Sequence, residues 1–484
     1  MKVLLALTLL SSVFCSKILI NCPSISKSHV YLCGKYADVL QKAGHKVVVF
    51  IPSYKKVIDD FNGTKLAEVF RIKDIGTSFD DIVSIDGWKE ILAASNLGIR
   101  MKMKFDTLCF VPMCANLIDR TDELEKLKAY NFDLAITEDV DYCNFGVIHH
   151  LGIKNIVLMS SEPLMDHVSA MFGVPAPYSY VPAMEENFLS DRMTFTERAY
   201  NTYKRLAAKY MNYAIEAQIT EVFREKFGPD FPSMWEIASN SSLVVVNTNE
   251  LFDLQKPIIH KTVFIGLIKD QEKQILPQSV DLILNKGRKG TILISFGTVA
   301  PFPYLPEQIQ HAFLHVIQKF KDYHFIIKSL KGDTTTKTLF ESVKNVDLLD
   351  WIPQTILLED RRIKLFVSHG GMNSVLESME AGTPMLVIPI FTDQFRNGKN
   401  VERRNAGLAL LRQRITNDTL EDHFSRLLED DLYSITAKRL SSMMKDRPFS
   451  SEERLVKWIN FVLKYYPFDN FDVEGHDMIT YNDQ

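Results

Sequence analysis

The chain lacks several patterns that would place it in common classes of protein. No segment reaches the 18 or more apolar residues of a membrane-spanning helix, and there is no internal repeat or low-complexity segment. The dinucleotide fingerprint G-x-G-x-x-G, the triphosphate loop G-x-x-x-x-G-K and the hydrolase elbow G-x-S-x-G are all absent. These absences argue against an NAD-linked oxidoreductase, a P-loop nucleoside triphosphatase and an α/β-hydrolase.

The chain also lacks a strong excess of charge. Its net charge is -4 over 484 residues, so neither nucleic acid nor an anionic membrane is indicated as the main partner. With 46% hydrophobic and 24% charged residues, the composition is typical of a soluble globular protein. The length suggests two or three domains.

Cysteine is scarce, and none occurs after residue 143. Cys15 lies in the expected signal peptide, which leaves an odd number of cysteines: Cys22, Cys33, Cys109, Cys114 and Cys143. At least one thiol is therefore free or paired outside the chain, and the sequence leaves the pairing open. No metal site is predicted, because His311 and His315 share one face of a predicted helix without a third ligand nearby in sequence.

Residues 1–16 have the pattern of a cleaved signal peptide. Lys2 is followed by a short apolar core, too short to cross a bilayer, and by small residues at the expected cleavage site. The mature chain is therefore expected in the secretory pathway, in the endoplasmic reticulum lumen or outside the cell. Three sequons become candidate glycosylation sites there, at Asn62, Asn240 and Asn417.

Both halves of the mature chain alternate between predicted strands and helices, which favours two α/β domains with parallel sheets. In the first half, strands are expected at 17–20, 46–50, 132–137, 156–159 and 243–247, and helices at 30–43 and 195–227. In the second half, strands are expected at 291–298, 324–328, 363–367 and 386–389, and helices at 307–319 and 373–381. The expected divisions are 17–265, a linker at 266–285, 286–450, and a returning helix and tail at 451–484. Gly297, Thr298 and His369 follow strands of the second domain, so they could face a cleft between the domains.

Residues 351–394 hold the most informative pattern of the chain. Gly370 and Gly371 join a buried strand to a helix, a geometry that exposes backbone N–H groups to a phosphate. Asn373 and Glu377 lie four residues apart and share one face of that helix. An aromatic ring, amides, a histidine and carboxylates at these offsets suit a nucleotide sugar.

This stretch resembles the donor-binding signature of the UDP-glycosyltransferase family, which includes the animal UDP-glucuronosyltransferases. The matching residues are Trp351, Gln354, His369, Gly371, Asn373, Ser374, Glu377, Asp393 and Gln394. The resemblance implies a GT-B fold, in which two Rossmann-like domains face each other across a cleft, with the acceptor on the first domain. It also implies a role in detoxification and no tightly bound cofactor.

The resemblance further implies a role for each residue of the signature. Trp351 stacks on the uracil ring and Gln354 contacts the uridine. His369 and the Asn373-Ser374 pair hold the diphosphate. Glu377 binds the ribose hydroxyls, while Asp393 and Gln394 bind hydroxyls of the transferred sugar.

His29 is the candidate general base. It lies in the loop after the first strand, and the family carries its base at this position; histidine has a suitable pKa for the role. Glu138 stands where the family commonly has the partner aspartate, so Glu138 is the expected partner and Asp139 is the alternative. His45 is interpreted as structural.

The favoured function is an inverting transfer of glucuronate or glucose from its UDP-sugar to a hydroxyl or acid group of a small lipophilic acceptor. The donor sugar stays open, because nothing in the signature distinguishes the two. The alternative is a catalytically weak protein that binds a UDP-sugar or a lipophile. Peripheral membrane contact and oligomerisation also stay open. Animal members of the family usually continue into a membrane-spanning helix, and this chain ends about where that helix would begin.

Overall fold

The computed structural model describes residues 15–75, 99–184, 186–269, 275–298 and 300–473. The expected signal peptide lies outside these residues, apart from residues 15 and 16. The loops near residues 80–115 and 160–200 are rich in Met, Phe and Tyr and are expected to form an acceptor pocket; residues 80–98 of the first loop lie outside the described residues, as does the tail after residue 473.

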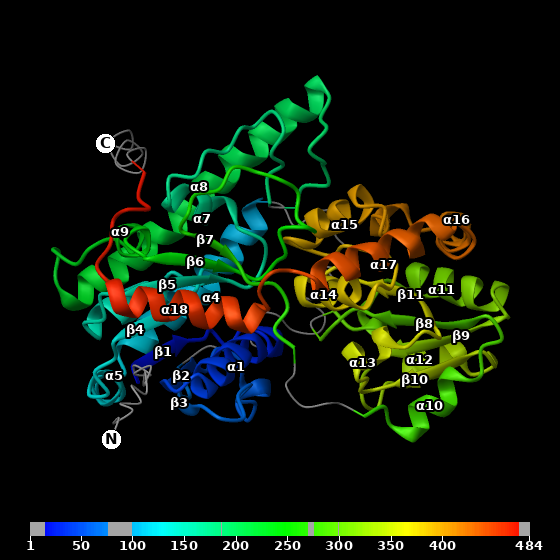
Figure 1. The fold of residues 1–484 in the computed structure, drawn as a ribbon, viewed down its shortest axis with the longest axis horizontal. Helices are drawn as coiled ribbons and strands as arrows, with labels where there is room; N and C mark the ends of the chain where they lie inside the picture. Colours follow the sequence, from blue (N-terminus) through cyan, green and yellow to red (C-terminus); the bar gives the residue numbers. More distant parts are fainter. Residues whose placement is uncertain (1–14, 76–98, 185, 270–274, 299, 474–484) are drawn as a thin grey trace, which may run out of the picture.

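The first domain is built on a seven-stranded parallel sheet with the order β3-β2-β1-β4-β5-β6-β7 (Figure 1). The strands are β1 (Lys17–Asn21), β2 (Lys46–Pro52), β3 (Glu68–Ile72), β4 (Leu134–Glu138), β5 (Ile156–Ser160), β6 (Leu243–Val246) and β7 (Thr262–Phe264). The apolar central strands are buried on both faces, as expected of a parallel sheet between two layers of helices. The strand order reverses between β1 and β4, so the carboxyl ends of these two strands meet at the point where α/β proteins bind ligands.

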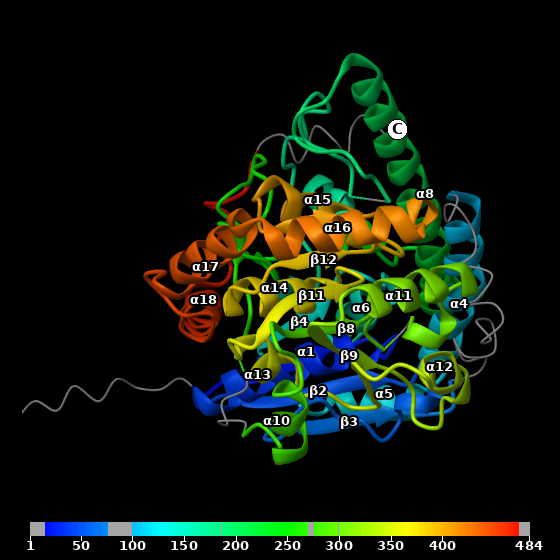
Figure 2. The ribbon, with the colours of Figure 1, turned by 90° about the vertical axis from the view of Figure 1, so that its right-hand side faces the viewer.

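Two hydrophobic clusters cover the two faces of this sheet. One contains residues of α4, α6 and α8, and the other contains residues of α1 and α18. Among its described residues, the first domain has the helices α1 (Lys27–Lys42), α4 (Ile99–Ile118), α5 (Thr121–Lys128), α6 (Cys143–His150), α7 (Asp166–Met171), α8 (Phe195–Phe227) and α9 (Met234–Ser239), with a 3-10 turn at Lys56–Ile58. A capping box between Thr194 and Glu197 begins α8, and one end of this long helix projects beyond the rest of the molecule (Figures 1 and 2).

The second domain is built on a six-stranded parallel sheet with the order β10-β9-β8-β11-β12-β13. The strands are β8 (Gly290–Ser295), β9 (Tyr323–Lys328), β10 (Val346–Leu349), β11 (Ile363–Ser368), β12 (Met385–Val387) and β13 (Gly407–Ala409). Its strand order reverses between β8 and β11. Gly297 and His369 therefore follow adjacent strands and lie at one place on the edge of the sheet.

The helices of the second domain again lie on both faces of the sheet. They are α10 (Gln278–Leu284), α11 (Glu307–Lys319), α12 (Thr334–Phe340), α13 (Gln354–Glu359), α14 (Met372–Ala381), α15 (Gln394–Arg403), α16 (Asn417–Glu429) and α17 (Asp431–Lys445), with 3-10 turns at Phe302–Tyr304 and Arg412–Arg414. The α10 helix falls within the range predicted as a linker. Its Val280 and Leu284 pack into the core of the second domain.

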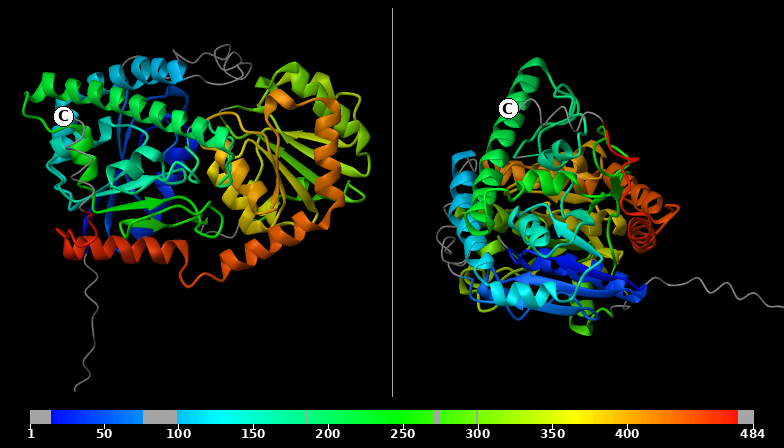
Figure 3. Two further views of the ribbon diagram at one scale, coloured as in Figure 1. Left: turned by 90° about the horizontal axis from the view of Figure 1, so that it is seen from above. Right: turned by 90° about the vertical axis from the view of Figure 1, so that its left-hand side faces the viewer.

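The final helix, α18 (Ser451–Tyr465), crosses back to the first domain (Figures 1 and 3). Leu455, Ile459 and Val462 are fully buried there, in the cluster that also contains residues of β1 and α1. The two sheets face each other with their carboxyl edges toward one cleft, so the fold is the predicted GT-B arrangement of two Rossmann-like domains.

Candidate active site

His29 and Glu138 form a hydrogen-bonded pair at the edge of the first sheet. His29 lies in the first turn of α1, and Glu138 is the last residue of β4. His29 Nδ1 lies 2.5 Å from Glu138 Oε2, and the glutamate is fully buried. The adjacency of β1 and β4 explains the pairing, because it brings together residues that are far apart in sequence.

The surroundings of His29 make its imidazole more basic. Burial by itself lowers the pKa of His29, but the charge and hydrogen bond of Glu138 and the charges of Asp139 and Asp393 outweigh it, so the pKa is raised above 6.5. An N–H at Nδ1 that donates to the carboxylate leaves Nε2 as the acceptor. This is the tautomer that a general base requires.

Asp139, the alternative partner, has different contacts. It accepts a hydrogen bond from the Ser160 hydroxyl at 3.2 Å, and His167 Nε2 lies 3.7 Å from its carboxylate. Burial and the nearby charge of Glu138 raise the pKa of Asp139 to about 7. The geometry therefore favours Glu138 as the group that orients His29.

A cavity of about 380 Å³ lies between the two domains and brings most of the predicted site residues together. The predicted residues that line it are His29, Gly297, Thr298, Gln354, His369, Gly371, Asn373, Ser374, Glu377, Asp393 and Gln394. Glu138 lies behind His29. Trp351, which follows β10, is not in the lining and is 65% exposed, so its stacking on uracil stays a prediction.

Two glycines make room for the ring of His369. A Cβ at Gly297 would lie 2.9 Å from His369 Cε1, and a Cβ at Gly371 would lie 2.6 Å from Nε2. Gly297 also has a φ of +79°, which side chains with a Cβ rarely adopt. Burial, with a smaller effect of the Lys328 charge, lowers the pKa of His369 to about 4. At neutral pH the ring is therefore an uncharged hydrogen-bonding group.

The face of α14 presents a polar network to the cavity. Gln354 Nε2 donates to Glu377 Oε2 at 2.7 Å and to Ser374 Oγ at 3.1 Å. Asn373 Oδ1 accepts a hydrogen bond of 2.9 Å from Asn247, which follows β6 in the first domain. The Asn373 contact therefore links the two domains directly beside the cavity.

Asp393 and Gln394 lie at the start of α15 and are both buried. Burial raises the pKa of Asp393 to about 6, although hydrogen bonds from Asn397, at 2.5 Å, and from Thr392 act in the opposite direction. Gln394 Oε1 accepts hydrogen bonds from the backbone N–H groups of residues 390 and 391, at 2.9 and 3.2 Å. Gln394 thus shapes the loop before α15 as well as lining the cavity.

Some lining residues were missed by the sequence analysis. Lys328 ends β9, Lys55 follows β2, and Ser161 and Glu162 follow β5. All four follow or end parallel strands, so a search of every strand end would have found them. Burial lowers the pKa of Lys328.

The other histidines singled out in the sequence lie outside this cavity. His45 is buried at the opposite end of β2, and burial lowers its pKa. His315 Nε2 lies 2.9 Å from a carboxylate oxygen of Glu421 on α16. Both placements agree with structural roles.

The cysteine pairing that the sequence left open is Cys22 with Cys33 and Cys114 with Cys143. Cys109 is buried and belongs to neither disulfide, and Cys15 is exposed. The first disulfide joins the loop after β1 to α1. It therefore lies close to the His29–Glu138 pair.

Comparisons with known proteins identify relatives of the whole chain. The family model for "UDP-glucoronosyl and UDP-glucosyl transferase" matches residues 17–482. The putative UDP-glucuronosyltransferase ugt-50 of Caenorhabditis elegans is 44% identical over 96% of this chain and 88% of its own length. UDP-glucuronosyltransferase 3A1 of Bos taurus is 30% identical over 91% of this chain and 83% of its own length.

The fold also matches a solved glycosyltransferase, the glycotransferase of kitacinnamycin. The TM-score is 0.62 at 17% identity, over 93% of this chain and 99% of that one. Within the residues that the structure describes, no helix is both long and apolar enough to cross a membrane. The match of the family model across both domains, together with these relatives, shows that the chain belongs to the UDP-glucuronosyl and UDP-glucosyl transferase family and is a UDP-glycosyltransferase.

Proposed function

We propose that the protein transfers glucuronate or glucose from its UDP-sugar to a small lipophilic acceptor, with inversion at the anomeric carbon. The observation that carries this proposal is the 2.5 Å contact between His29 and Glu138 at the wall of the cavity. A buried carboxylate that raises the pKa of a histidine creates a base suited to an alcohol or phenol.

The reaction that fits this geometry is a single displacement. The acceptor hydroxyl gives its proton to His29 Nε2, and its oxygen attacks the anomeric carbon from the face opposite the UDP group. The bond from the anomeric carbon to the phosphate oxygen breaks, and UDP leaves with the bonding electron pair. Glu138 stabilises the imidazolium that forms. One displacement inverts the configuration.

We propose that each residue of the signature binds the part of the UDP-sugar that matches its side chain. Trp351 stacks on uracil, Gln354 contacts the uridine and Glu377 accepts hydrogen bonds from the ribose. The neutral His369 and the start of α14 bind the diphosphate, since exposed N–H groups at a helix start favour an anion. Asp393 and Gln394 bind the sugar hydroxyls.

The lipophilic acceptor is supported by a second cavity in the first domain. This cavity of about 1010 Å³ lies between α7 and α8, and its wall includes Tyr178, Tyr213 and Trp235. His167 also lines it, and His167 lies 3.7 Å from Asp139 beside the base. Charged residues such as Asp166, Arg205 and Lys209 also line the cavity, and a wall that mixes aromatic and polar side chains suits a small acceptor with an apolar body and a polar group.

Membrane contact and location in the secretory lumen belong to the same proposal. Tyr203, Leu206, Tyr210 and Tyr213 form an exposed stripe at helical spacing on α8. Tyrosine is favoured at the membrane–water interface, and we propose that this stripe rests on a membrane. If the protein is lumenal and peripheral, carbonate treatment of membranes should release it. Retention in the pellet would count against this placement.

The test is to incubate the protein with UDP-glucuronate and UDP-glucose separately, with a panel of phenols and carboxylic acids, and to detect glycosides by mass spectrometry. His29→Ala should lower turnover by about 100- to 10,000-fold while UDP still binds. Near wild-type turnover in that variant would overturn the role of His29. UDP binding without product from any donor and acceptor pair would favour the alternative, a binding protein.

A further inference from the structure

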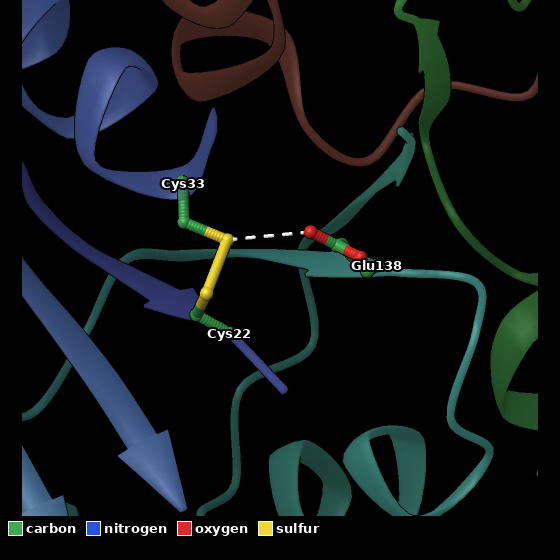
Figure 4. Close-up of side chains that lie close together, drawn as sticks. All are labelled: Cys22, Cys33 and Glu138. Carbon is green, nitrogen blue, oxygen red and sulfur yellow. Dashed lines mark hydrogen bonds between the residues drawn. A yellow bond between two sulfur atoms is a disulfide. The ribbon is translucent and has the colours of Figure 1, made fainter. Parts of the chain in front are cut away.

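The sulfur atoms of one disulfide lie against the carboxylate that orients the base. The Cys22–Cys33 bond joins the loop after β1 to α1, and Cys33 Sγ lies 3.4 Å from Glu138 Oε1 (Figure 4). The two cysteines and the glutamate are fully buried, and one potential ligand atom from each lies within 4.8 Å of the others. In the proposed function, Oε2 of Glu138 accepts the hydrogen bond from His29, and Oε1 has no role.

Glu138 Oε1 is a buried acceptor that faces sulfur. Among the described residues, Cys33 Sγ is the group that lies within hydrogen-bond distance of Oε1. His29 is hydrogen-bonded to the other carboxylate oxygen, Oε2. A disulfide sulfur carries no proton to donate. A buried carboxylate oxygen without a donor is costly, so this oxygen would be stabilised by a thiol proton or by a cation.

The spacing of these atoms suits a zinc ion once the disulfide is opened. Zinc binds thiolate at about 2.3 Å and carboxylate at about 2.0–2.2 Å in a tetrahedral arrangement, which separates sulfur from oxygen by about 3.5 Å. The observed distance between Cys33 Sγ and Glu138 Oε1 is 3.4 Å. Two cysteines and one carboxylate supply three ligands, and water can complete the set.

We propose that reduction of the Cys22–Cys33 disulfide creates a zinc site formed by both thiolates and Glu138. In the reduction, a phosphine takes the oxygen of a water molecule to become a phosphine oxide. The S–S bond breaks, and each sulfur gains one electron and one proton. Zinc then displaces the two thiol protons into solvent and binds Oε1.

Zinc at this site would lower the rate of glycosyl transfer by weakening the hydrogen bond between Glu138 and His29. Coordination at Oε1 draws electron density from the carboxylate and weakens Oε2 as the acceptor for the His29 N–H. This consequence rests on the proposed function of His29 and Glu138, whereas the binding of zinc does not. The reduced protein with zinc is expected to lose activity by about 10-fold relative to the reduced protein with a chelator. The oxidised protein with zinc should be unaffected.

The test uses the full chain, reduced with a phosphine that is then removed under nitrogen, and titrated with Zn²⁺ against a chromophoric chelator. One zinc per chain is expected, and Cys22→Ser and Cys33→Ser should each weaken its affinity at least about 100-fold. Cys109→Ser, at a buried cysteine outside both disulfides, is the matched control and should bind zinc like the wild type. Glu138→Gln should also weaken binding.

A second variant covers the case in which reduction of both disulfides unfolds the chain. Cys22→His cannot form the first disulfide, leaves Cys114–Cys143 intact, and presents an imidazole, a thiolate and a carboxylate. It should bind one zinc without any reductant. The proposal is overturned if the folded Cys22→His variant and the reduced wild type both fail to bind zinc, or if the bound zinc survives Cys33→Ser and is lost in Cys114→Ser. Zinc bound with unchanged turnover would support the metal site and count against the role of Glu138 in transfer.

Discussion

At the scale of single residues, the chemistry of the site depends on which groups are charged. His369 has a pKa of about 4 and is neutral, whereas the pKa of His29 is raised above 6.5. Burial lowers the pKa of both rings, but the carboxylate of Glu138 outweighs it at His29, whereas the charge of Lys328 lowers the pKa of His369 further. One site therefore contains an uncharged hydrogen-bonding imidazole and a basic one.

The first prediction concerns the pH profile of Glu138→Gln. The base must be neutral, so wild-type activity should fall as the pH drops through the raised pKa of His29. Loss of the Glu138 charge lowers that pKa, so the acidic limb of kcat/KM should move to lower pH. The rate above the limb should fall by about 10- to 100-fold, because the base is weaker and less well oriented.

Asp139→Asn is the matched control for this prediction. It removes a neighbouring carboxylate that contacts Ser160 and His167, so it should change the profile far less. If the acidic limb shifts in Asp139→Asn but not in Glu138→Gln, then Asp139 rather than Glu138 orients His29.

The second prediction concerns donor binding by His369 and Glu377. His369→Ala and Glu377→Ala each remove a polar group from the cavity and should weaken UDP binding by about 1–3 kcal/mol. Calorimetry with UDP measures the change. His315→Ala, at a histidine outside the cavity, should bind UDP like the wild type. Unchanged affinity in both cavity variants would contradict the proposed donor site.

The residues that we propose to bind the donor could be named from the sequence because most of them lie in one short stretch with fixed offsets, and all of these except Trp351 line the cavity. Lys328 and Asn247 could not be predicted in the same way, because each follows or ends a strand far from that stretch. The order of the strands in the two sheets places Lys328 at the cavity and Asn247 against Asn373 beside it. The register of β1 against β4 also decides whether Glu138 or Asp139 contacts His29.

At the scale of elements, the long helices were the most predictable parts. The expected ranges 195–227 and 307–319 coincide with α8 and α11, whose ends are marked by a capping box and by glycine or proline. The α1 helix begins at Lys27 rather than at the predicted residue 30, because residues 27–29 join its first turn. This difference places His29 on a helix, although a loop was expected.

The third prediction tests the turn that begins α14. Gly371→Ala adds a Cβ that would lie 2.6 Å from His369 Nε2, so the ring must move. UDP affinity should fall by about 10-fold, which corresponds to roughly 1.4 kcal/mol. Gly371 has a φ of -59°, so the substitution adds no backbone strain and the chain should keep its stability.

Gly152→Ala is the control with the opposite expected effects: it should lower stability without changing UDP binding. Gly152 has a φ of +78° and open space around its Cα, so alanine should cost about 1–2 kcal/mol of folding stability and leave UDP binding unchanged. Thermal unfolding and calorimetry on both variants separate the two effects. Equal UDP affinity in Gly371→Ala and the wild type would show that His369 does not depend on this turn.

At the scale of the whole molecule, the two domains are joined by buried polar contacts that no sequence pattern indicated. Arg396 on α15 is 1% exposed and lies 3.3 Å from Asp253. It also donates a hydrogen bond to the backbone carbonyl of Pro182 at 3.2 Å. The GT-B arrangement was implied by the family resemblance, but such contacts depend on the docking of complete domains.

The fourth prediction is that Arg396→Met destabilises the protein by about 3–5 kcal/mol, because it leaves Asp253 buried without its cation. Urea unfolding followed by circular dichroism measures the change. Arg288→Met is the control, since Arg288 pairs with Asp322 at the surface and should unfold like the wild type. Similar midpoints in both variants would mean that the buried pair contributes little to domain docking.

The return of α18 to the first domain has a consequence for the order of events during synthesis. Domains generally fold as they emerge from the ribosome, beginning with the N-terminal one. Here Leu455, Ile459 and Val462 of α18 complete the core beside β1 and α1. The first domain therefore cannot complete its core until α18 has been synthesised, which happens after the entire second domain. Until then its apolar face stays uncovered, which makes the nascent first domain a natural substrate for chaperones.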